Sequence, residues 1–182
     1  MNKIYFVRHG ECEFNLLKLF AGQTECPLTE LGRGQAVLAA KDILNQQLKI
    51  DKIVSSTLWR ASESAVIIAE SINYPIDQIV TNNLFMERDF GILEGTKRSD
   101  FFDTYSYQDI DNAPEAETLD QLRQRAIKAY DYLKTLPEDN ILVISHSAFF
   151  RAFMRAISSV SLNKEYTNPF TSIKNGKVYE LL

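Results

Sequence analysis

The sequence predicts an α/β fold, a three-layer sandwich with a mainly parallel central sheet, helices on both faces and an antiparallel edge. Two apolar runs, Ile4–Val7 and Ile141–Ile144, are too short for helices and have the length of buried parallel strands. Segments with helical spacing separate the strand candidates, an alternation typical of a parallel sheet covered on both faces. The tail contains Asn175-Gly176 between two strand candidates, which predicts a hairpin and supplies the antiparallel edge.

The remaining elements follow in order along the chain. After the first strand, Thr29 is placed as the N-cap of a helix whose apolar residues include Ala36, Ala40 and Ile43. The predicted elements that follow are a strand at 52–55, a helix with an apolar face from Leu58 to Ile72, a strand at 78–81, a helix from Leu119 to Leu133 and a last long helix beginning over Phe149–Ile157.

The segment 96–117 does not fit this alternation. It carries four aromatic residues among six acidic and two basic ones. We expect a lid-like insertion over the top of the sheet, where loops carry specificity, although an irregular connection with inward-packed aromatics fits the pattern equally well. Because no repeat or linker divides the chain, residues 1–182 are predicted to form a single domain.

Composition limits the classes of function. With 182 residues and 45% apolar content, the chain can bury a core without disulfides or a structural metal. The net charge of −4 argues against nucleic-acid and membrane partners, and the apolar start is too short for a signal peptide, so we expect a cytoplasmic protein. Two histidines and two cysteines argue against a zinc site, and we interpret Cys12 as a small filler rather than a redox-sensitive thiol. The oligomeric state is not readable.

The two histidines share one placement, because each follows an apolar run. His9 comes just after the first predicted strand and His146 just after the strand that ends at Ser145. In open α/β sheets, ligands bind beyond the carboxyl ends of the strands. A single histidine there is usually a loop or core residue, but two favour one active site assembled from opposite ends of the sequence.

Five short blocks of the sequence resemble one enzyme family. Arg8-His9-Gly10-Glu11, with Asn15 four residues on, resembles the signature of the histidine phosphatase superfamily, whose best-known members are the phosphoglycerate mutases. Four further blocks match in family order: Pro27-Leu28-Thr29-Glu30-Leu31-Gly32, Ser55-Ser56-Thr57-Leu58-Trp59-Arg60-Ala61, Met86-Glu87-Arg88-Asp89-Phe90-Gly91 and Ser145-His146. The resemblance spans most of the chain and implies phosphoryl transfer through a phosphohistidine, with no metal or cofactor.

The resemblance also implies residue roles, and each suits its chemistry. His9 would be the nucleophile, and Glu87 would protonate the leaving oxygen and later take a proton from water. Glu94 lies close in sequence and is the competing acid. The implied phosphate ligands are the fork-shaped donors Arg8 and Arg60, together with Asn15 and Ser147. His146 would be a third catalytic residue, which adds a donor and, if protonated, positive charge. Ser147 stands where the family usually has glycine, which keeps the backbone amide but changes the contour of the pocket.

Three functions remain open after this comparison. The family contains hydrolases and mutases, and a mutase needs additional cations, for which Arg88, Lys97 and Arg98 are candidates. The acidic insertion instead argues for hydrolysis of a small phosphomonoester with little additional charge. A phosphate-binding module without turnover is the third possibility, which the intact set of reactive residues disfavours. A phosphatase acting on a small phosphorylated metabolite is therefore the leading prediction.

Overall fold

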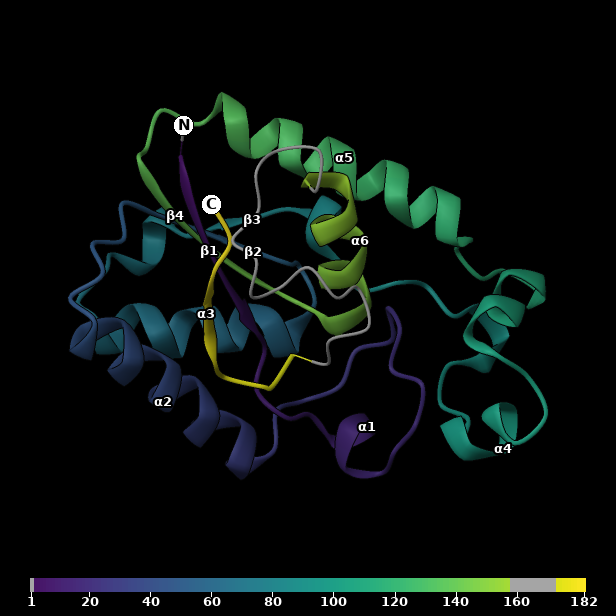
Figure 1. Cartoon of the computed structure of the whole chain (residues 1–182). Coiled ribbons are helices and arrows are strands. Elements are labelled where there is room, and N and C mark those ends of the chain that lie inside the picture. Colours follow the sequence, from purple (N-terminus) through teal and green to yellow (C-terminus); the bar gives the residue numbers. More distant parts are fainter. Residues whose placement is uncertain (1, 158–172) are drawn as a thin grey trace.

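A computed structural model describes residues 2–157 and 173–182, with the central sheet among its helices (Figure 1). The strand order in the sheet is β3-β2-β4-β1-β5. The four parallel strands are β1 (Lys3–Arg8), β2 (Lys52–Ser55), β3 (Val80–Thr81) and β4 (Asn140–Ser145), and β5 (Val178–Glu180) runs antiparallel to β1. The predicted α/β sandwich with an antiparallel edge is confirmed.

Helices cover both faces of this sheet (Figure 1). One face packs against α5 and α6, and the other packs against α2 and α3. Because the strands are buried on both sides, their sequences are continuous apolar runs rather than alternating ones. The four covering helices are α2 (Glu30–Asn45), α3 (Trp59–Ser71), α5 (Leu119–Thr135) and α6 (Ser147–Ile157).

Short elements connect these layers. The N-cap predicted at Thr29 is observed, since its side chain accepts a hydrogen bond from the Gly32 amide at 3.0 Å. The short connecting helices are α1 (Glu13–Leu16), α4 (Arg98–Phe102) and the 3₁₀ turns η1 (Ile76–Gln78), η2 (Asn83–Phe85), η3 (Gly91–Leu93) and η4 (Tyr107–Asn112).

Two sequence-based boundaries are wrong. The third strand is limited to Val80–Thr81, because the residues before it close a 3₁₀ turn behind Pro75 instead of pairing with β2. The last helix begins at Ser147, two residues before the predicted start. Its first turn lies directly after His146, so the histidine is held at a helix start rather than in a loop.

The predicted tail hairpin is also wrong, although its Asn-Gly turn exists. Ile173 and Lys174 are not in a strand, and Ser172 lies outside the described residues. The turn instead docks against the end of β1, where the Gly176 amide donates to the Arg8 carbonyl at 3.0 Å. β5 then pairs with β1, whose edge is not occupied by another strand of the sheet.

The segment 96–117 contains α4 and η4 and packs through a small aromatic cluster of its own. Phe101 and Phe102 contact Phe20, with ring centroids 5.8 and 5.6 Å apart. The backbone of Lys97 pairs with Leu19 in the loop that follows α1. The insertion therefore lies against the loops at the carboxyl end of the sheet, to one side of the sandwich (Figure 1).

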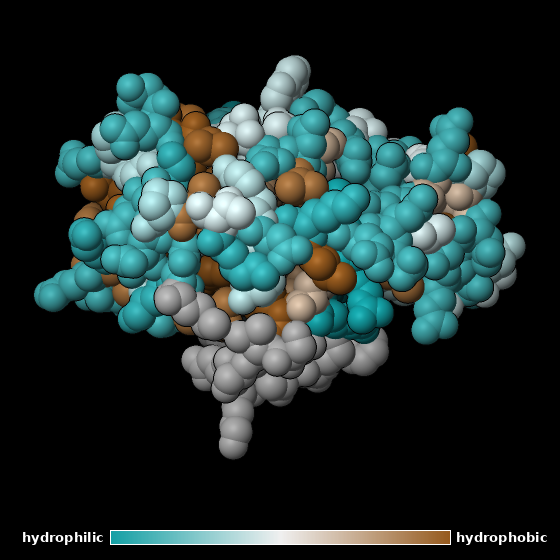
Figure 2. All heavy atoms as spheres, turned by 90° about the horizontal axis from the view of Figure 1, so that it is seen from above, coloured by the Kyte–Doolittle hydropathy of each residue, from teal (hydrophilic) through white to brown (hydrophobic). Residues whose placement is uncertain are grey.

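Hydrophobic side chains are scattered over the face shown in Figure 2, which is mostly hydrophilic. Among the helices of residues 2–157, none has the length and apolar character needed to cross a membrane.

Candidate active site

The register of the central strands brings the two histidines together. β1 and β4 are neighbours, and Arg8 pairs with Ser145, so the next residue on each strand is a histidine. The His9 amide donates to the Ser145 carbonyl at 3.0 Å. The rings of His9 and His146 lie with centroids 4.9 Å apart. Residues 137 positions apart thus share one location for a purely topological reason.

His9 is held as a neutral imidazole with one unprotonated ring nitrogen. Its Nδ1 lies 2.5 Å from the Gly10 carbonyl oxygen, which can only accept, so Nδ1 carries the proton and Nε2 keeps its lone pair. Burial lowers the pKa of His9 well below its usual value, and the nearby cations Arg60 and Arg8 lower it further. An unprotonated Nε2 is the form required of a nucleophile.

His146 is also buried, and it has a partner that the sequence analysis missed. Its Nε2 lies 2.8 Å from the hydroxyl of Ser56, while Nδ1 has no hydrogen-bond partner within the described part of the chain. Burial lowers the pKa of His146 well below its usual value, with Arg60 adding to the effect. Ser56 follows β2, which pairs with β4, so this contact depends on strand order and not on sequence proximity.

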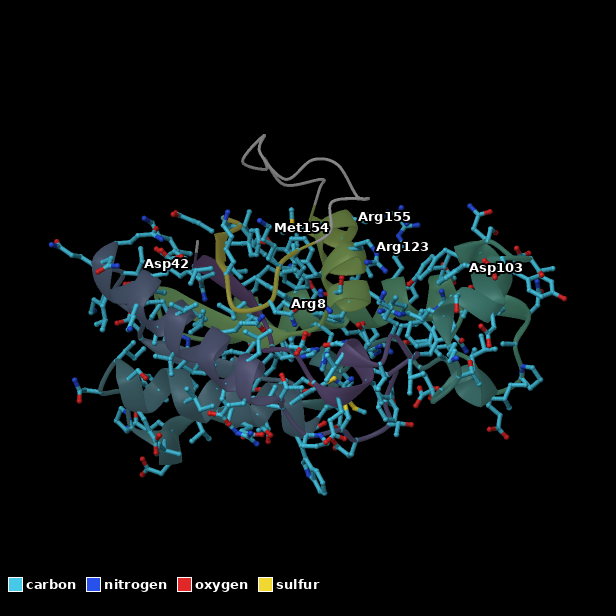
Figure 3. All side chains as sticks on the ribbon, turned by 90° about the horizontal axis from the view of Figure 1, so that it is seen from below. Arg8, Asp42, Asp103, Arg123, Met154 and Arg155 are labelled. Atoms are coloured by element: carbon cyan, nitrogen blue, oxygen red, sulfur yellow. The ribbon has the colours of Figure 1, made fainter. Side chains whose placement is uncertain are left out.

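The positive charges of Arg8 and Arg60 both act on His9. Arg8 lies in the middle of the molecule in Figure 3, and its Nη1 donates to the Ile173 carbonyl at 3.1 Å. The guanidinium of Arg60 is almost fully buried and donates to the carbonyls of Gly22 and Thr24 at 2.6 and 3.0 Å. In both arginines the buried Nε atom has no partner within the described residues. Together with Nδ1 of His146, these donors suit the oxygens of an anion.

The two candidate acids have different surroundings. The carboxylate of Glu87 accepts from the amides of Ala148 and Phe149, at 3.2 and 2.9 Å, in the first turn of α6 after His146. Its charge also acts on Arg8. The carboxylate of Glu94 instead accepts from loop amides, including Gln23 at 2.8 Å. Glu94 therefore organises a loop, whereas Glu87 lies beside the histidine pair.

A second residue that the sequence analysis missed holds Glu87 in position. Arg125 on α5 donates to the carbonyls of Met86 and Glu87, at 2.7 and 3.0 Å, and pairs with both carboxylate oxygens of Glu117. An arginine in the middle of an amphipathic helix normally lies in solvent, so spacing alone could not single it out. The positive charge of Arg125 also contributes to the lowered pKa of His146.

Asn15 and Ser147 make local contacts. The Oδ1 of Asn15 accepts from the Cys12 amide at 3.3 Å, and the Ser147 hydroxyl accepts from Arg151 at 3.1 Å. No hydrogen bond joins either side chain to a histidine within the described residues.

Cys12 is not an isolated filler, because its Sγ lies 2.8 Å from that of Cys26.

The acidic residues of the insertion are mostly engaged elsewhere. Asp111 forms an ion pair with the fully buried Arg88, and Glu117 pairs with Arg125. Asp103 lies at the outer end of the insertion, away from Arg8 (Figure 3). The charges that act most on Arg8 include that of Arg98 from the insertion. The expected repulsion of anionic substrates stays a prediction, and Arg88, a candidate mutase cation, is buried and paired with Asp111.

Comparison with known proteins decides the family. The sequence model described as the histidine phosphatase superfamily (branch 1) matches residues 4–181. The chain belongs to this superfamily. It is 32% identical over 160 residues to the uncharacterized phosphatase PhoE of Bacillus subtilis, covering 87% of this chain and 78% of that protein. It is 28% identical over 169 residues to the 2,3-bisphosphoglycerate-dependent phosphoglycerate mutase of Bartonella bacilliformis, covering 87% and 82%.

Solved structures of the superfamily share the fold. A mycobacterial glucosyl-3-phosphoglycerate phosphatase in complex with VO3 superposes with a TM-score of 0.78 at 21% identity, over 98% of this chain and 90% of that one. YhfR of Bacillus stearothermophilus superposes with a TM-score of 0.76 at 22% identity, over 99% and 95%. The relatives of this histidine phosphatase superfamily member thus include phosphatases and mutases, and its three-dimensional likeness establishes the architecture.

Proposed function

We propose that this protein is a phosphomonoester hydrolase that acts on a small phosphorylated metabolite through a phosphohistidine at His9. The observation that carries the proposal is the state of His9, a neutral imidazole whose Nε2 carries no proton and whose ring centroid lies 4.9 Å from that of His146. The nearby Arg8 and Arg60 each keep an Nε donor without a partner within the described residues. Phosphoryl transfer requires a positioned nucleophile and positive charge around the phosphoryl oxygens, and this arrangement supplies both.

In the first step, Nε2 of His9 attacks phosphorus as the bond to the ester oxygen breaks. Arg8 and Arg60 bind the equatorial oxygens, with Asn15, Ser147 and Nδ1 of His146 as neutral donors. The Ser56 hydroxyl, by donating to Nε2 of His146, would keep the proton on Nδ1. The donors stabilise the charge that develops in the transition state.

Glu87 would carry the proton in both steps. It protonates the leaving oxygen, and then takes a proton from the water that attacks the phosphohistidine and breaks the nitrogen–phosphorus bond. Three backbone amides, those of Arg88, Ala148 and Phe149, occupy acceptor positions on its two oxygens. A carboxylate offers about four such positions, so one remains for the proton in transit.

The test is phosphate release from an aryl phosphate in excess chelator, with wild type compared with His9→Ala. We expect chelator-resistant turnover that falls by at least about 10³-fold in the variant, since removal of a covalent nucleophile leaves only binding and charge stabilisation. Trapping with ³²P-labelled substrate should label wild type with acid-labile phosphate and leave the variant unlabelled. Turnover that survives in folded His9→Ala contradicts the proposal.

A mutase is the second candidate, favoured by Arg98 and Arg151, whose charges both act on Arg8. The assay is conversion of 3-phosphoglycerate with catalytic 2,3-bisphosphoglycerate. Isomerisation faster than phosphate release would favour this function. The proposed setting for either activity is the cytoplasm, where reducing conditions keep Cys12 and Cys26 as thiols.

A further inference from the structure

The two cysteines of the chain are buried in contact with each other beside the candidate site. Cys12 precedes α1 and Cys26 lies in the following loop, and their Sγ atoms are 2.8 Å apart. The backbones on either side are already paired, since Cys12 bridges Leu28 and the Glu13 amide donates to the Pro27 carbonyl at 3.2 Å. A disulfide needs a sulfur separation of about 2.05 Å, so the two sulfurs must approach by about 0.8 Å.

The surroundings of the pair favour a thiolate. The Cys26 thiol donates to Cys12 and lowers the pKa of Cys12 to about 6, against the opposing effect of burial. Arg60 adds positive charge, with Nη1 3.8 Å from the sulfur of Cys26. The thiolate is the reactive form of cysteine, so we assign Cys12, whose sulfur accepts the hydrogen bond from Cys26, as the attacking sulfur and Cys26 as the resolving one.

We infer that Cys12 and Cys26 form a redox-modification site, in which a peroxide makes a reversible disulfide that disables the phosphate-binding site. The Cys12 thiolate attacks one oxygen of hydrogen peroxide, the O–O bond breaks, and the released hydroxide takes a proton to become water. The Cys26 sulfur then attacks the resulting sulfenic acid, the S–S bond forms, and the S–O bond breaks with loss of a second water. Two thiols are oxidised by two electrons and the peroxide is reduced.

The disulfide would act through residues on both sides of it. Cys26 lies in the loop whose carbonyls at Gly22 and Thr24 orient the guanidinium of Arg60. Cys12 lies three residues after His9. Drawing the sulfurs together therefore displaces the loop that orients Arg60, the turn that holds His9, or both. A displacement near 1 Å in a catalytic site can cost about 10²-fold in rate. This effect on turnover rests on the proposed function, whereas formation of the disulfide does not.

The experiment treats reduced full-length protein with hydrogen peroxide, stops the reaction with catalase, and follows mass, thiols and activity in the same samples. We expect a monomeric product about 2 Da lighter in which both thiols are lost. Phosphate release should fall at least about tenfold in step with that product, and dithiothreitol should restore it. Because the chain has only two cysteines, a monomeric product assigns the disulfide without mapping.

Two single variants serve as matched controls, each compared with its own untreated sample. Cys26→Ser leaves the attacking thiol without a resolving partner, so peroxide should add about 16 Da per oxygen and give no lighter species. Cys12→Ser removes the attacking thiolate and should retain its activity under peroxide. A disulfide that leaves activity unchanged, or inactivation without the lighter species, overturns the inference.

The two proposals fail in distinguishable ways. Lack of turnover by the reduced wild type speaks against the proposed hydrolase alone. In that case the shift in melting temperature caused by inorganic phosphate replaces turnover, and it should be smaller in the oxidised protein than in the reduced protein. An equal shift, or absence of the lighter species, contradicts the redox site.

Discussion

At the scale of single residues, the contrast between Glu87 and Glu94 separates a reactive carboxylate from a structural one. Both carboxylates accept hydrogen bonds from several backbone amides, so the number of hydrogen bonds alone does not distinguish them. The two carboxylates differ in which segments of the chain supply those amides. Glu87 faces the first turn of α6 after His146, whereas Glu94 closes the loop that orients Arg60.

Replacing Glu87 by glutamine should therefore change how the rate depends on the leaving group. Glu87→Gln keeps an oxygen acceptor for the amides of α6 but removes the transferable proton. We expect kcat for an alkyl phosphate to fall by about 10²- to 10⁴-fold, and kcat for an aryl phosphate, which leaves readily without protonation, to fall much less. Steady-state kinetics on both substrates measure the ratio. Glu94→Gln is the control, and a stronger leaving-group dependence there would reverse the assignment.

The buried state of His9 also bears on the pH dependence of activity. Because its pKa is held well below the usual value, the nucleophile stays unprotonated in mildly acidic solution, and the first step of the proposed mechanism also requires an acid that carries a proton. We expect phosphate release to be fastest at mildly acidic to neutral pH. A rate that rises steadily to pH 9 would contradict this division of roles.

At the scale of elements, the Asn-Gly turn acts as a clamp on the end of β1. The Asn175 side chain donates to the His9 carbonyl at 2.7 Å, and Gly176 has a φ of +65°. A Cβ built on Gly176 would lie 2.3 Å from the backbone oxygen of Gln35, so no larger residue fits. The tail therefore contributes to the backbone geometry around the nucleophile.

Gly176→Ala should destabilise the fold by about 1–3 kcal/mol, because it adds left-handed backbone strain to a steric clash. Gly34→Ala is the matched control, since Gly34 lies in α2 with no atom near its hypothetical Cβ. That substitution should stabilise the protein by about 0.5–1 kcal/mol through helix propensity. Urea unfolding of the two variants measures both values. Equal effects would show that the turn is not a constrained clamp.

Arg125 connects α5 to the segment that carries Glu87. Its forked contacts with two carbonyls and with Glu117 require a planar guanidinium. Arg125→Lys should lower the free energy of unfolding by about 2–4 kcal/mol, since a partly buried carboxylate loses its partner. It should also lower kcat by moving Glu87. Arg33→Lys, at the more exposed pair with Glu63, is the control and should cost about 1 kcal/mol or less.

At the scale of the whole molecule, two buried neutral histidines make stability depend on pH. Their folded pKa values lie well below 6.5, the usual value in an unfolded chain. Below pH 6.5 the unfolded chain therefore binds protons that the folded protein does not, and stability falls as the pH drops. Above that pH both states are neutral at these positions, and the contribution is constant.

We expect this effect to reach about 1.4 kcal/mol per pH unit for each histidine well below pH 6.5. Urea unfolding between pH 5 and pH 8 measures the slope, and a His9→Gln/His146→Gln double variant serves as the reference. Its stability should fall less steeply with acid than that of the wild type. Parallel curves would mean that the histidines are accessible to protons in the folded protein.

The sequence predicts the parts of this molecule whose signals are local. Apolar runs located β1 and β4, and strand direction then predicted that His9 and His146 would meet. The hairpin was mispredicted because Asn175-Gly176 signals a turn but not the partner of the strand that follows. Ser56, Arg125 and the contact of Cys12 with Cys26 depend on strand order and helix packing, which no short pattern contains.

The position of β4 between β1 and β2 also has a consequence for how the protein is made. The strand that presents His9 is translated before its neighbour β4, whose paired residues lie 137 positions further along the chain. The clamp at Asn175 follows later still. A nascent chain that lacks β4 therefore cannot bring His9 and His146 together. Pairing of strands so distant in sequence is also intrinsically slow. Function should emerge in one step, after β4 and the clamp at Asn175 have both been synthesised.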